Sequence, residues 1–435
     1  MAINEKLGQK RGVAAALDEI GYLQAMSGKS DDALASYAKA LALQREIGMK
    51  EEQGDTLLEM GTVYQDRGDY DQALAHYKEA LDIQRQIGDQ GAEALCLNNI
   101  GFVELARGNI DNALTNFQQA LQIREQLGVP DEIARSLEGL GEAYTHTGQY
   151  DQALSSLMRA LDLARKADDA HWIANISHQK GLVFEYQGRV GPAVESMRDA
   201  VKAFRDQGEH GDAMASFLND YAGALARAGR GDEAAGPLDE AEGIARDIKN
   251  NGLAASISNT RGDVAYYRGD LTSAGQFYQS ALHLTAHSKD NDVIVQSKLN
   301  VAIVALAQGR AKDALAMLRP LLKPDSTVSS YLKVRAAIAY AEAEVGMKDY
   351  AHAQHDLNQT VTVTEKAGMR LDNARIYYLL GESGRLSGSG DRTQIAYYYR
   401  DTVRLLEAVK AEPGAGKLLT RSDLKAIYEN ASRWK

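Results

Sequence analysis

The sequence repeats itself with a period of about 40 residues over most of its length. The clearest copies are anchored at Gly21, Gly61, Gly101 and Gly141, and weaker copies at Gly181, Ala222, Gly262, Ala302, Ala339 and Gly381. A fixed period of this length is typical of repeat architectures, in which each unit packs mainly on its neighbours. The sequence therefore predicts about ten tandem copies of one structural unit.

Each copy is predicted to be a pair of helices joined by a tight turn. A glycine stands seven residues after every anchor, where it suits the left-handed conformation that ends a helix. These turn glycines are Gly28, Gly68, Gly108, Gly148, Gly188, Gly229, Gly269, Gly309, Gly346 and Gly388. The residues that follow, such as Asp69-Tyr70-Asp71, are polar and can cap a second helix. Each unit is thus helix A, a turn, helix B and a looser link.

Helix B carries a small, large, small pattern on one face. In the first copy this pattern is Ala33, Tyr37 and Ala40, and related residues recur at the same phase along the chain. Steps of four and then three residues place all three positions on one side of a helix. Small residues allow close helix approach, so this face is predicted to be core.

The pattern resembles the tetratricopeptide repeat, in a 40-residue variety with long helices. The resemblance rests on the anchor glycine, an aromatic residue at Tyr64 or Tyr144, and the turn Gly-Asp-Tyr-Asp-Gln-Ala at residues 68–73. It implies an all-α fold, a right-handed α-solenoid. We expect an N-terminal lead (1–10), the repeat array (11–408) and a C-terminal capping helix (409–435).

Three departures from the repeat predict local irregularities. Copies nine and ten each have two extra residues after the turn glycine, and Pro320 and Pro324 are expected to shorten helix B of copy eight. In the C-terminal segment, Leu424, Ile427 and Tyr428 are predicted to point inward and cover the last repeat.

Charge and composition argue against several partners. The net charge of −11 disfavours nucleic acid and anionic membranes, because both need basic surface. Cys96 is the single cysteine, so no intramolecular disulfide can form. The first residues, MAINEKLGQKRG, lack the apolar core of a signal peptide, and no apolar run is long enough for a membrane span. We expect a cytoplasmic protein.

No motif predicts catalysis, a metal or a cofactor. The segment LQAMSGKS (23–30) lacks the first glycine of a phosphate-binding loop, and GESGRLSGSG (381–390) follows no strand. The pairs His283/His287 and His352/His355 lack further ligands, and Cys96 has no nearby base in sequence, so a buried inert thiol is expected. A solenoid is expected to offer an open groove rather than a catalytic pocket.

The resemblance implies that helix A lines the concave face, and this places a candidate site there. Three residues before the anchors stand several polar residues, among them Asn98, Asn219 and Asn259. We predict that their amides form a ladder that binds the backbone of an extended peptide, because an amide both donates and accepts. The full candidate set is Asn98, Phe102, Glu138, His178, Tyr186, Asn219, Arg227, Asn259, Tyr266 and Tyr267. The alternative is an idle, solvated helix face.

Acidic residues dominate this face in copies one to five, which predicts a protein or peptide partner that is basic toward the N-terminal half. The leading hypothesis is a protein-interaction scaffold that binds an extended peptide or a helix. A second is a sensory or regulatory region of a bacterial signalling protein, because the C-terminal residues loosely resemble the end of repeat regions attached to bacterial serine/threonine kinases. A third is a self-associating structural element. The sequence identifies neither the partner nor the oligomeric state.

Overall fold

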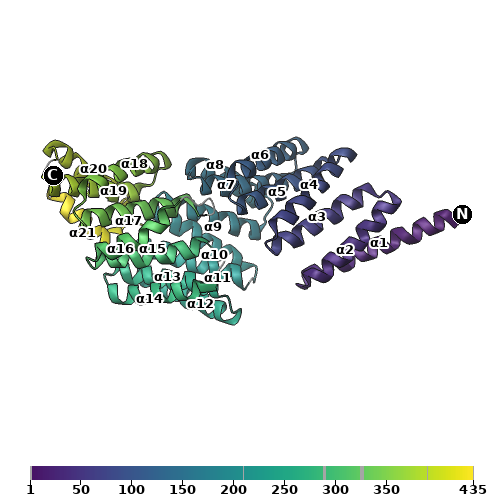
Figure 1. Cartoon of the computed structure of the whole chain (residues 1–435), viewed down its shortest axis with the longest axis horizontal. Coiled ribbons are helices and arrows are strands. Elements are labelled where there is room, and N and C mark those ends of the chain that lie inside the picture. The colour runs from purple at the N-terminus through teal and green to yellow at the C-terminus, as the bar shows by residue number, and fades with distance from the viewer. Residues whose placement is uncertain (1, 209, 288–290, 324–327, 389, 435) are drawn as a thin grey trace. The chain divides into compact units, whose positions relative to one another are not determined.

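The computed structural model describes residues 2–208, 210–287, 291–323, 328–388 and 390–434. These residues form 21 α-helices and four short 3-10 helices, with no strand among them (Figure 1). The predicted all-α class and solenoid architecture are confirmed.

Ten helix pairs follow one another, as the repeat predicted. The A helices are α1 (Ala2–Met26), α3 (Lys50–Asp66), α5 (Gln90–Ala106), α7 (Pro130–His146), α9 (Ala170–Tyr186), α11 (Asp212–Arg227), α13 (Asn251–Tyr267), α15 (Asn291–Ala307), α17 (Ser330–Gly346) and α19 (Arg370–Ser387). The B helices are α2 (Ser30–Ile47), α4 (Tyr70–Ile87), α6 (Ile110–Leu127), α8 (Tyr150–Lys166), α10 (Val190–Asp206), α12 (Ala235–Asp247), α14 (Leu271–Leu284), α16 (Ala311–Leu318), α18 (Tyr350–Ala367) and α20 (Arg392–Lys410). Residues 2–10, expected as a lead, are part of α1.

The turn glycines adopt the expected left-handed conformation in nine of the ten repeats, with φ between 68° and 84°. The exception is Gly346, which ends α17 as a helical residue. In that repeat the two extra residues lengthen the turn, and Lys348 takes the left-handed conformation with φ of 65°. The prediction for Gly346 was therefore wrong.

The anchor glycine is required by the large residue of helix B. A Cβ atom at Gly61 would lie 2.5 Å from Cε1 of Tyr77, so only glycine leaves room for the ring. Tyr77 itself is 1% exposed, and Ala73 and Ala80 beside it are fully buried. The small, large, small face of helix B is thus the core of each repeat, as predicted.

Helix B of repeat eight is short, as its prolines predicted. Helix α16 ends at Leu318, and the 3-10 helix η3 (Arg319–Leu322) follows and contains Pro320. The second proline, Pro324, lies outside the described residues.

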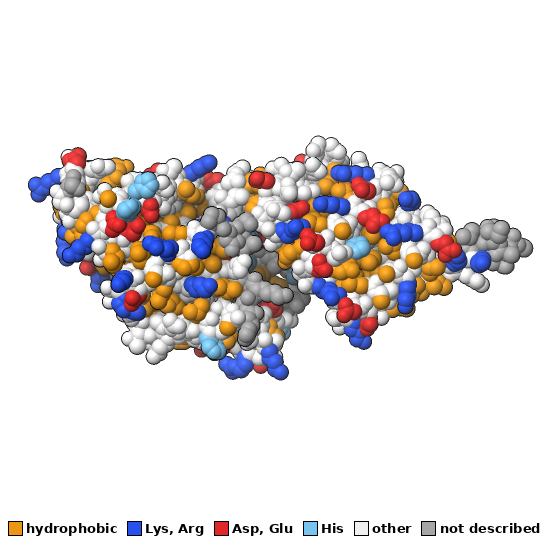
Figure 2. Space-filling view, viewed as in Figure 1, with side chains coloured by type: hydrophobic (Ala, Val, Ile, Leu, Met, Phe, Trp, Pro, Cys, Tyr) orange, Lys and Arg blue, Asp and Glu red, His pale blue; other side chains and the backbone are white. Residues whose placement is uncertain are grey.

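The chain divides into two compact units, Met1–Ala143 and Tyr144–Lys435. The boundary falls within α7, and each unit has its own core. Figure 2 shows basic and acidic side chains interspersed on the face in view. None of the helices in the described ranges combines the length and the apolar composition that a membrane span needs.

Within the C-terminal unit, repeats that are distant in sequence touch. The backbone N–H of Arg370, at the start of α19, donates to the carbonyl oxygen of Gln187 at 3.0 Å. The hydroxyl of Ser330, at the start of α17, donates to the carbonyl oxygen of His146 at 2.7 Å. These contacts bring the turns of early repeats in this unit against the first residues of late ones.

The C-terminal segment also crosses this unit. Its helix α21 (Ser422–Ser432) packs on α19, α20 and α13, and is the yellow element in Figure 1. Leu418, Leu424 and Ile427 are buried in a core that includes residues of α11. Tyr428 is only partly buried, and its hydroxyl donates to Glu407 at 2.8 Å. The segment contacts repeats far from the last one, which a terminal cap would not reach.

Candidate functional site

The C-terminal unit contains two adjoining recesses. They share five lining residues, namely Glu185, Arg227, Asp263, Asn300 and Tyr331. The other lining residues come mostly from α9, α11, α13, α15, α17 and α19, so the A helices line the site as the resemblance implied. Polar side chains of several helices converge on these recesses.

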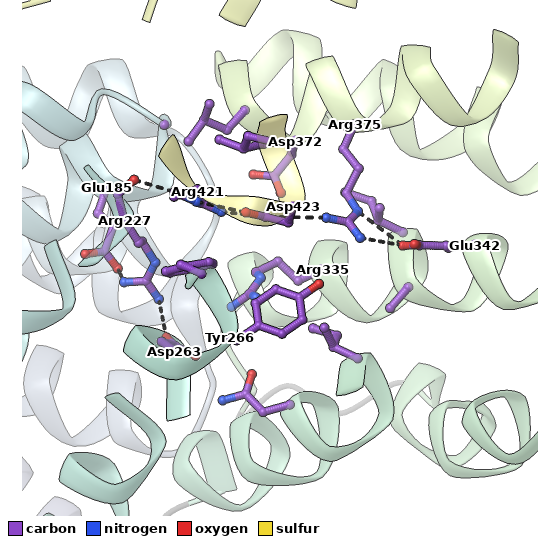
Figure 3. Close-up of a pocket in the computed structure, with 18 of the residues that line it drawn as sticks. Glu185, Arg227, Asp263, Tyr266, Arg335, Glu342, Asp372, Arg375, Arg421 and Asp423 are labelled. Carbon is purple, nitrogen blue, oxygen red and sulfur yellow. Dashed lines mark hydrogen bonds and ion pairs between the residues drawn. The ribbon is translucent and has the colours of Figure 1, made fainter. Parts of the chain in front are cut away.

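The first recess is lined by ion pairs (Figure 3). Arg227, the last residue of α11, pairs with Glu185 of α9, and its Nη2 lies 3.8 Å from Oδ2 of Asp263. Burial raises the pKa of Glu185, although the Arg227 charge and hydrogen bond oppose that rise. Arg227 therefore joins three consecutive A helices by charge.

A second group of charges involves the C-terminal segment. Arg421 holds Asp423 through two contacts, Nε to Oδ1 at 3.1 Å and Nη2 to Oδ2 at 2.8 Å. Arg375 of α19 lies 2.7 Å from Glu342 and 3.8 Å from the same Asp423. Burial alone would raise the pKa of Asp423, but Arg421 and Arg375 outweigh it and lower that pKa. These contacts fix the segment at the edge of the first recess.

Asn219 of α11 lines the second recess with an unsatisfied amide. The residue is 5% exposed, and its Nδ2 donates to Oδ1 of Asp220 at 3.2 Å. Its Oδ1 is buried, and no hydrogen-bond partner is found for it in the part of the chain that the structure describes. Oδ2 of Asp220 lies 2.7 Å from Nε2 of His178, whose ring stacks on Phe217 instead of facing the recess.

Asn259 of α13 lies in the same recess with its amide engaged. Its Nδ2 donates to Oγ of Ser297 at 2.9 Å, and its Oδ1 accepts from Nδ2 of Asn300 at 3.3 Å. In the same recess, the ring of Tyr186 stacks on that of Tyr331 with centroids 4.3 Å apart. The second recess therefore presents amides together with aromatic faces.

Asn98 does not belong to a peptide-binding ladder. It is 0% exposed, and its Oδ1 accepts from Nη1 of Arg124 at 3.2 Å. The same Nη1 donates to Ser136 of the next repeat at 2.8 Å. The prediction of an accessible amide was wrong at this position, because the residue 23 after the anchor, Arg124, reaches back and buries it. Asn98 thus joins repeats three and four.

Phe102 and Glu138 also lie in the N-terminal unit, away from the recesses. The ring of Phe102 meets that of Phe117 edge-on, at 4.9 Å and 72°, so it packs within its own repeat. Burial, and then the charge of Glu142, raises the pKa of Glu138 to about 7. Burial likewise raises the pKa of the Cys96 thiol to about 12, in agreement with the expected inert cysteine.

The recesses bring together six of the ten candidate residues and add others that the repeat did not predict. The six are Tyr186, Asn219, Arg227, Asn259, Tyr266 and Tyr267. The residues missed include Arg335, Asp372, Arg421 and Asp423. Arg335 stands one position before the ladder position of repeat nine, so a search one residue wider could have found it. In the described residues, no group of three or more His, Cys, Asp or Glu side chains is placed to hold a metal.

Comparison with known families agrees with this architecture. Models of the tetratricopeptide repeat match residues 52–126, 132–206, 178–247 and 296–320. The chain belongs to the tetratricopeptide-repeat proteins. No curated protein matches the sequence.

Several solved structures share the fold of this tetratricopeptide-repeat protein. They include the apo form of RapI, with 14% identity and a TM-score of 0.52 over 71% of this chain and 99% of that chain. The apo form of the quorum sensor NprR from B. thuringiensis gives 14% identity and a TM-score of 0.51 over 84% and 99%. NprR in complex with its cognate peptide NprX gives 13% identity and a TM-score of 0.57 over 83% and 99%. At these identities the likeness is one of fold.

Proposed function

We propose that this tetratricopeptide-repeat protein is an interaction scaffold that binds an extended peptide segment of a partner in the recesses of the C-terminal unit. The observation that carries the proposal is the buried amide oxygen of Asn219, which lines the second recess and lacks a partner among the described residues. Leaving a buried acceptor unsatisfied costs about 1–3 kcal/mol, and a ligand N–H can recover that energy.

The surrounding chemistry suits a peptide backbone. Asn259, Asn300 and Gln296 add amides to the same recess, and amides can donate to a peptide carbonyl and accept from a peptide N–H. The stacked rings of Tyr186 and Tyr331 offer apolar surface to side chains. The complex of NprR with its cognate peptide gives an example of a peptide bound by a protein of similar fold, and supports the proposal.

The test uses the full chain and a random hexapeptide mixture, with retained peptides identified by mass spectrometry. We expect a subset of peptides to be retained, and Asn219→Leu, which keeps the branching at Cγ but removes the amide, to lower retention about tenfold. The matched control is Asn358→Ala, which removes an exposed amide of α18 in the same unit and should leave retention unchanged. Equal retention by Asn219→Leu and the wild type would contradict the proposal.

The charge of the N-terminal unit supports a partner with basic residues outside the bound segment. Burial, followed by neighbouring carboxylates, raises the pKa values of Asp55 and Glu59, and a cation nearby would relieve that repulsion. Binding should therefore weaken as salt is raised. A sensory region of a signalling protein, self-association and a cytoplasmic location stay predictions. The sensory-region hypothesis is tested by a search for a kinase or DNA-binding domain in the same reading frame.

A further inference from the structure

The first recess holds four arginines, and three of them are paired with carboxylates. Arg227, Arg375 and Arg421 each contact a glutamate or aspartate, as the dashed lines in Figure 3 show. Arg335 of α17 lines the same recess, and no described carboxylate lies within ion-pairing distance of it. One guanidinium is thus left without a counter-charge in contact.

Arg335 is held in place yet unsatisfied. Its guanidinium carbon lies 5.6 Å from the ring centroid of Tyr331, which positions the cation by its aromatic face. Its Nη1 is buried and has no hydrogen-bond partner among the residues that are described. A buried charged donor without an acceptor is costly, so this group is the strongest unmet donor of the recess.

The rest of the recess disfavours additional anions. Its lining carries five carboxylates, and Asp372 has no ion pair in the described parts of the chain. Burial raises the pKa of Asp372, and Arg335 is the strongest of the charges that oppose this rise. Arg335 is thus the cation of the recess that lacks a direct contact with a described carboxylate and has Asp372 near it. Asp372, on the neighbouring helix α19, can accept a hydrogen bond from an N–H next to a carboxylate bound at Arg335.

We propose that Arg335 binds one carboxylate of the peptide ligand, through the paired N–H groups of its guanidinium. This inference rests on the proposed function and specifies its ligand. The geometry of an arginine fork matches a carboxylate in a way that a lysine does not. The carboxylate can come from the end of a peptide or from an acidic side chain, and the experiment separates these sources.

The probes are three pools of random hexapeptides made from uncharged residues. One pool has free C-terminal carboxylates, the second has C-terminal amides, and the third has C-terminal amides with one internal glutamate. The full chain is immobilised and retained peptides are quantified. We expect either the first or the third pool to be retained at least tenfold more than the second, and the preferred pool identifies the source of the carboxylate. Equal retention of all three pools by the wild type would overturn this inference and leave the proposed function standing.

Variants assign the preference to Arg335. Arg335→Gln should abolish the preference for the carboxylate-containing pool. Arg335→Lys should weaken this preference without reversing it, because the positive charge stays while the paired N–H groups of the guanidinium are lost. The control Arg246→Gln removes an arginine that is 73% exposed on α12 of the same unit, and should keep the wild-type preference. A folded Arg335→Gln protein that still prefers the carboxylate pool would overturn the assignment. If no pool is retained by the wild type, the proposed function fails, and this inference fails with it.

Discussion

The guanidinium of Arg421 donates from Nη1 to the backbone carbonyl oxygen of Arg227 at 3.0 Å, across 194 residues of sequence. That carbonyl is at the C-terminal end of α11, where the helix has no further N–H to offer it. The guanidinium carbon also lies 3.8 Å from the ring centroid of Tyr267, at the end of α13. A cation at two adjacent helix C-termini is favourable for both, so Arg421 joins the C-terminal segment to repeats six and seven.

Replacement of Arg421 should destabilise the C-terminal unit strongly. Arg421→Met keeps an unbranched aliphatic stem but leaves Asp423 without its closest counter-charge, so we expect a loss of about 3 kcal/mol. Urea denaturation followed by tryptophan fluorescence measures this unit, because both tryptophans, Trp172 and Trp434, lie in it. Arg246→Met should change stability by less than about 0.5 kcal/mol, and similar losses for the two variants would contradict the role of Arg421.

Two turn glycines with the same backbone angle separate turn strain from contact with the C-terminal segment. Gly229 and Gly309 both have φ of 76°. A Cβ atom at Gly229 would lie 2.0 Å from the carbonyl oxygen of Lys417, whereas one at Gly309 meets nothing within 4 Å. We expect Gly309→Ala to cost about 1–2 kcal/mol, and Gly229→Ala about 2 kcal/mol more.

The measurement for this pair is hydrogen exchange of residues 411–432 together with urea denaturation. Gly229→Ala should speed exchange in that segment and Gly309→Ala should not. Equal exchange in both variants would mean that the segment does not depend on the turn of repeat six.

The fold could be predicted from the sequence because the same packing problem recurs in every repeat. Gly61 and Tyr77 face each other, and the same glycine-aromatic contact returns at Gly101 with Phe117. The position of the C-terminal segment could not be predicted in this way. The contact between Arg421 and Arg227 occurs once, so no period in the sequence indicates it.

The site was only partly predictable, because the same position of the repeat lies in different surroundings in different copies. Asn98 and Asn219 both stand three residues before an anchor. The residue 23 after the anchor is Arg124 in the first case and the small Ala245 in the second. Arg124 fills the junction and donates to Oδ1 of Asn98, whereas Ala245 cannot reach the buried Oδ1 of Asn219. A contact that depends on pairs of positions is invisible when each position is considered alone.

Asn98 should therefore matter for stability. Asn98→Ala removes an acceptor from the buried Arg124, and we expect a loss of about 2 kcal/mol in the N-terminal unit. Hydrogen exchange in α5 and α7 measures the effect. Asn112→Ala, at an exposed position of α6, is the control and should leave exchange unchanged. Peptide retention should be the same in Asn98→Ala as in the wild type, and a loss of retention with intact stability would restore the ladder at this position.

Glu344 should make the stability of the C-terminal unit depend on pH. Burial, followed by the charges of Asp356 and Asp349, raises the pKa of Glu344 to about 7, while His352 opposes the rise. The side chain is 8% exposed and stands near the C-terminus of α17, where a negative charge is unfavourable. The folded state holds the proton of Glu344 more tightly than the unfolded state does. The contribution of Glu344 to the free energy of unfolding is therefore greatest below about pH 4.5 and falls as pH rises toward 7.

Glu344→Gln should remove that dependence. We expect the variant to be more stable than the wild type by about 1–3 kcal/mol at pH 8, and equal to it at pH 4, because the wild-type carboxyl is neutral there in the folded state. Glu195→Gln, at an exposed carboxylate of α10, should show no gain at either pH. Urea denaturation of the three proteins at both pH values decides the matter, since an equal gain at pH 4 and pH 8 would show that the effect of Glu344 comes from packing and not from its charge.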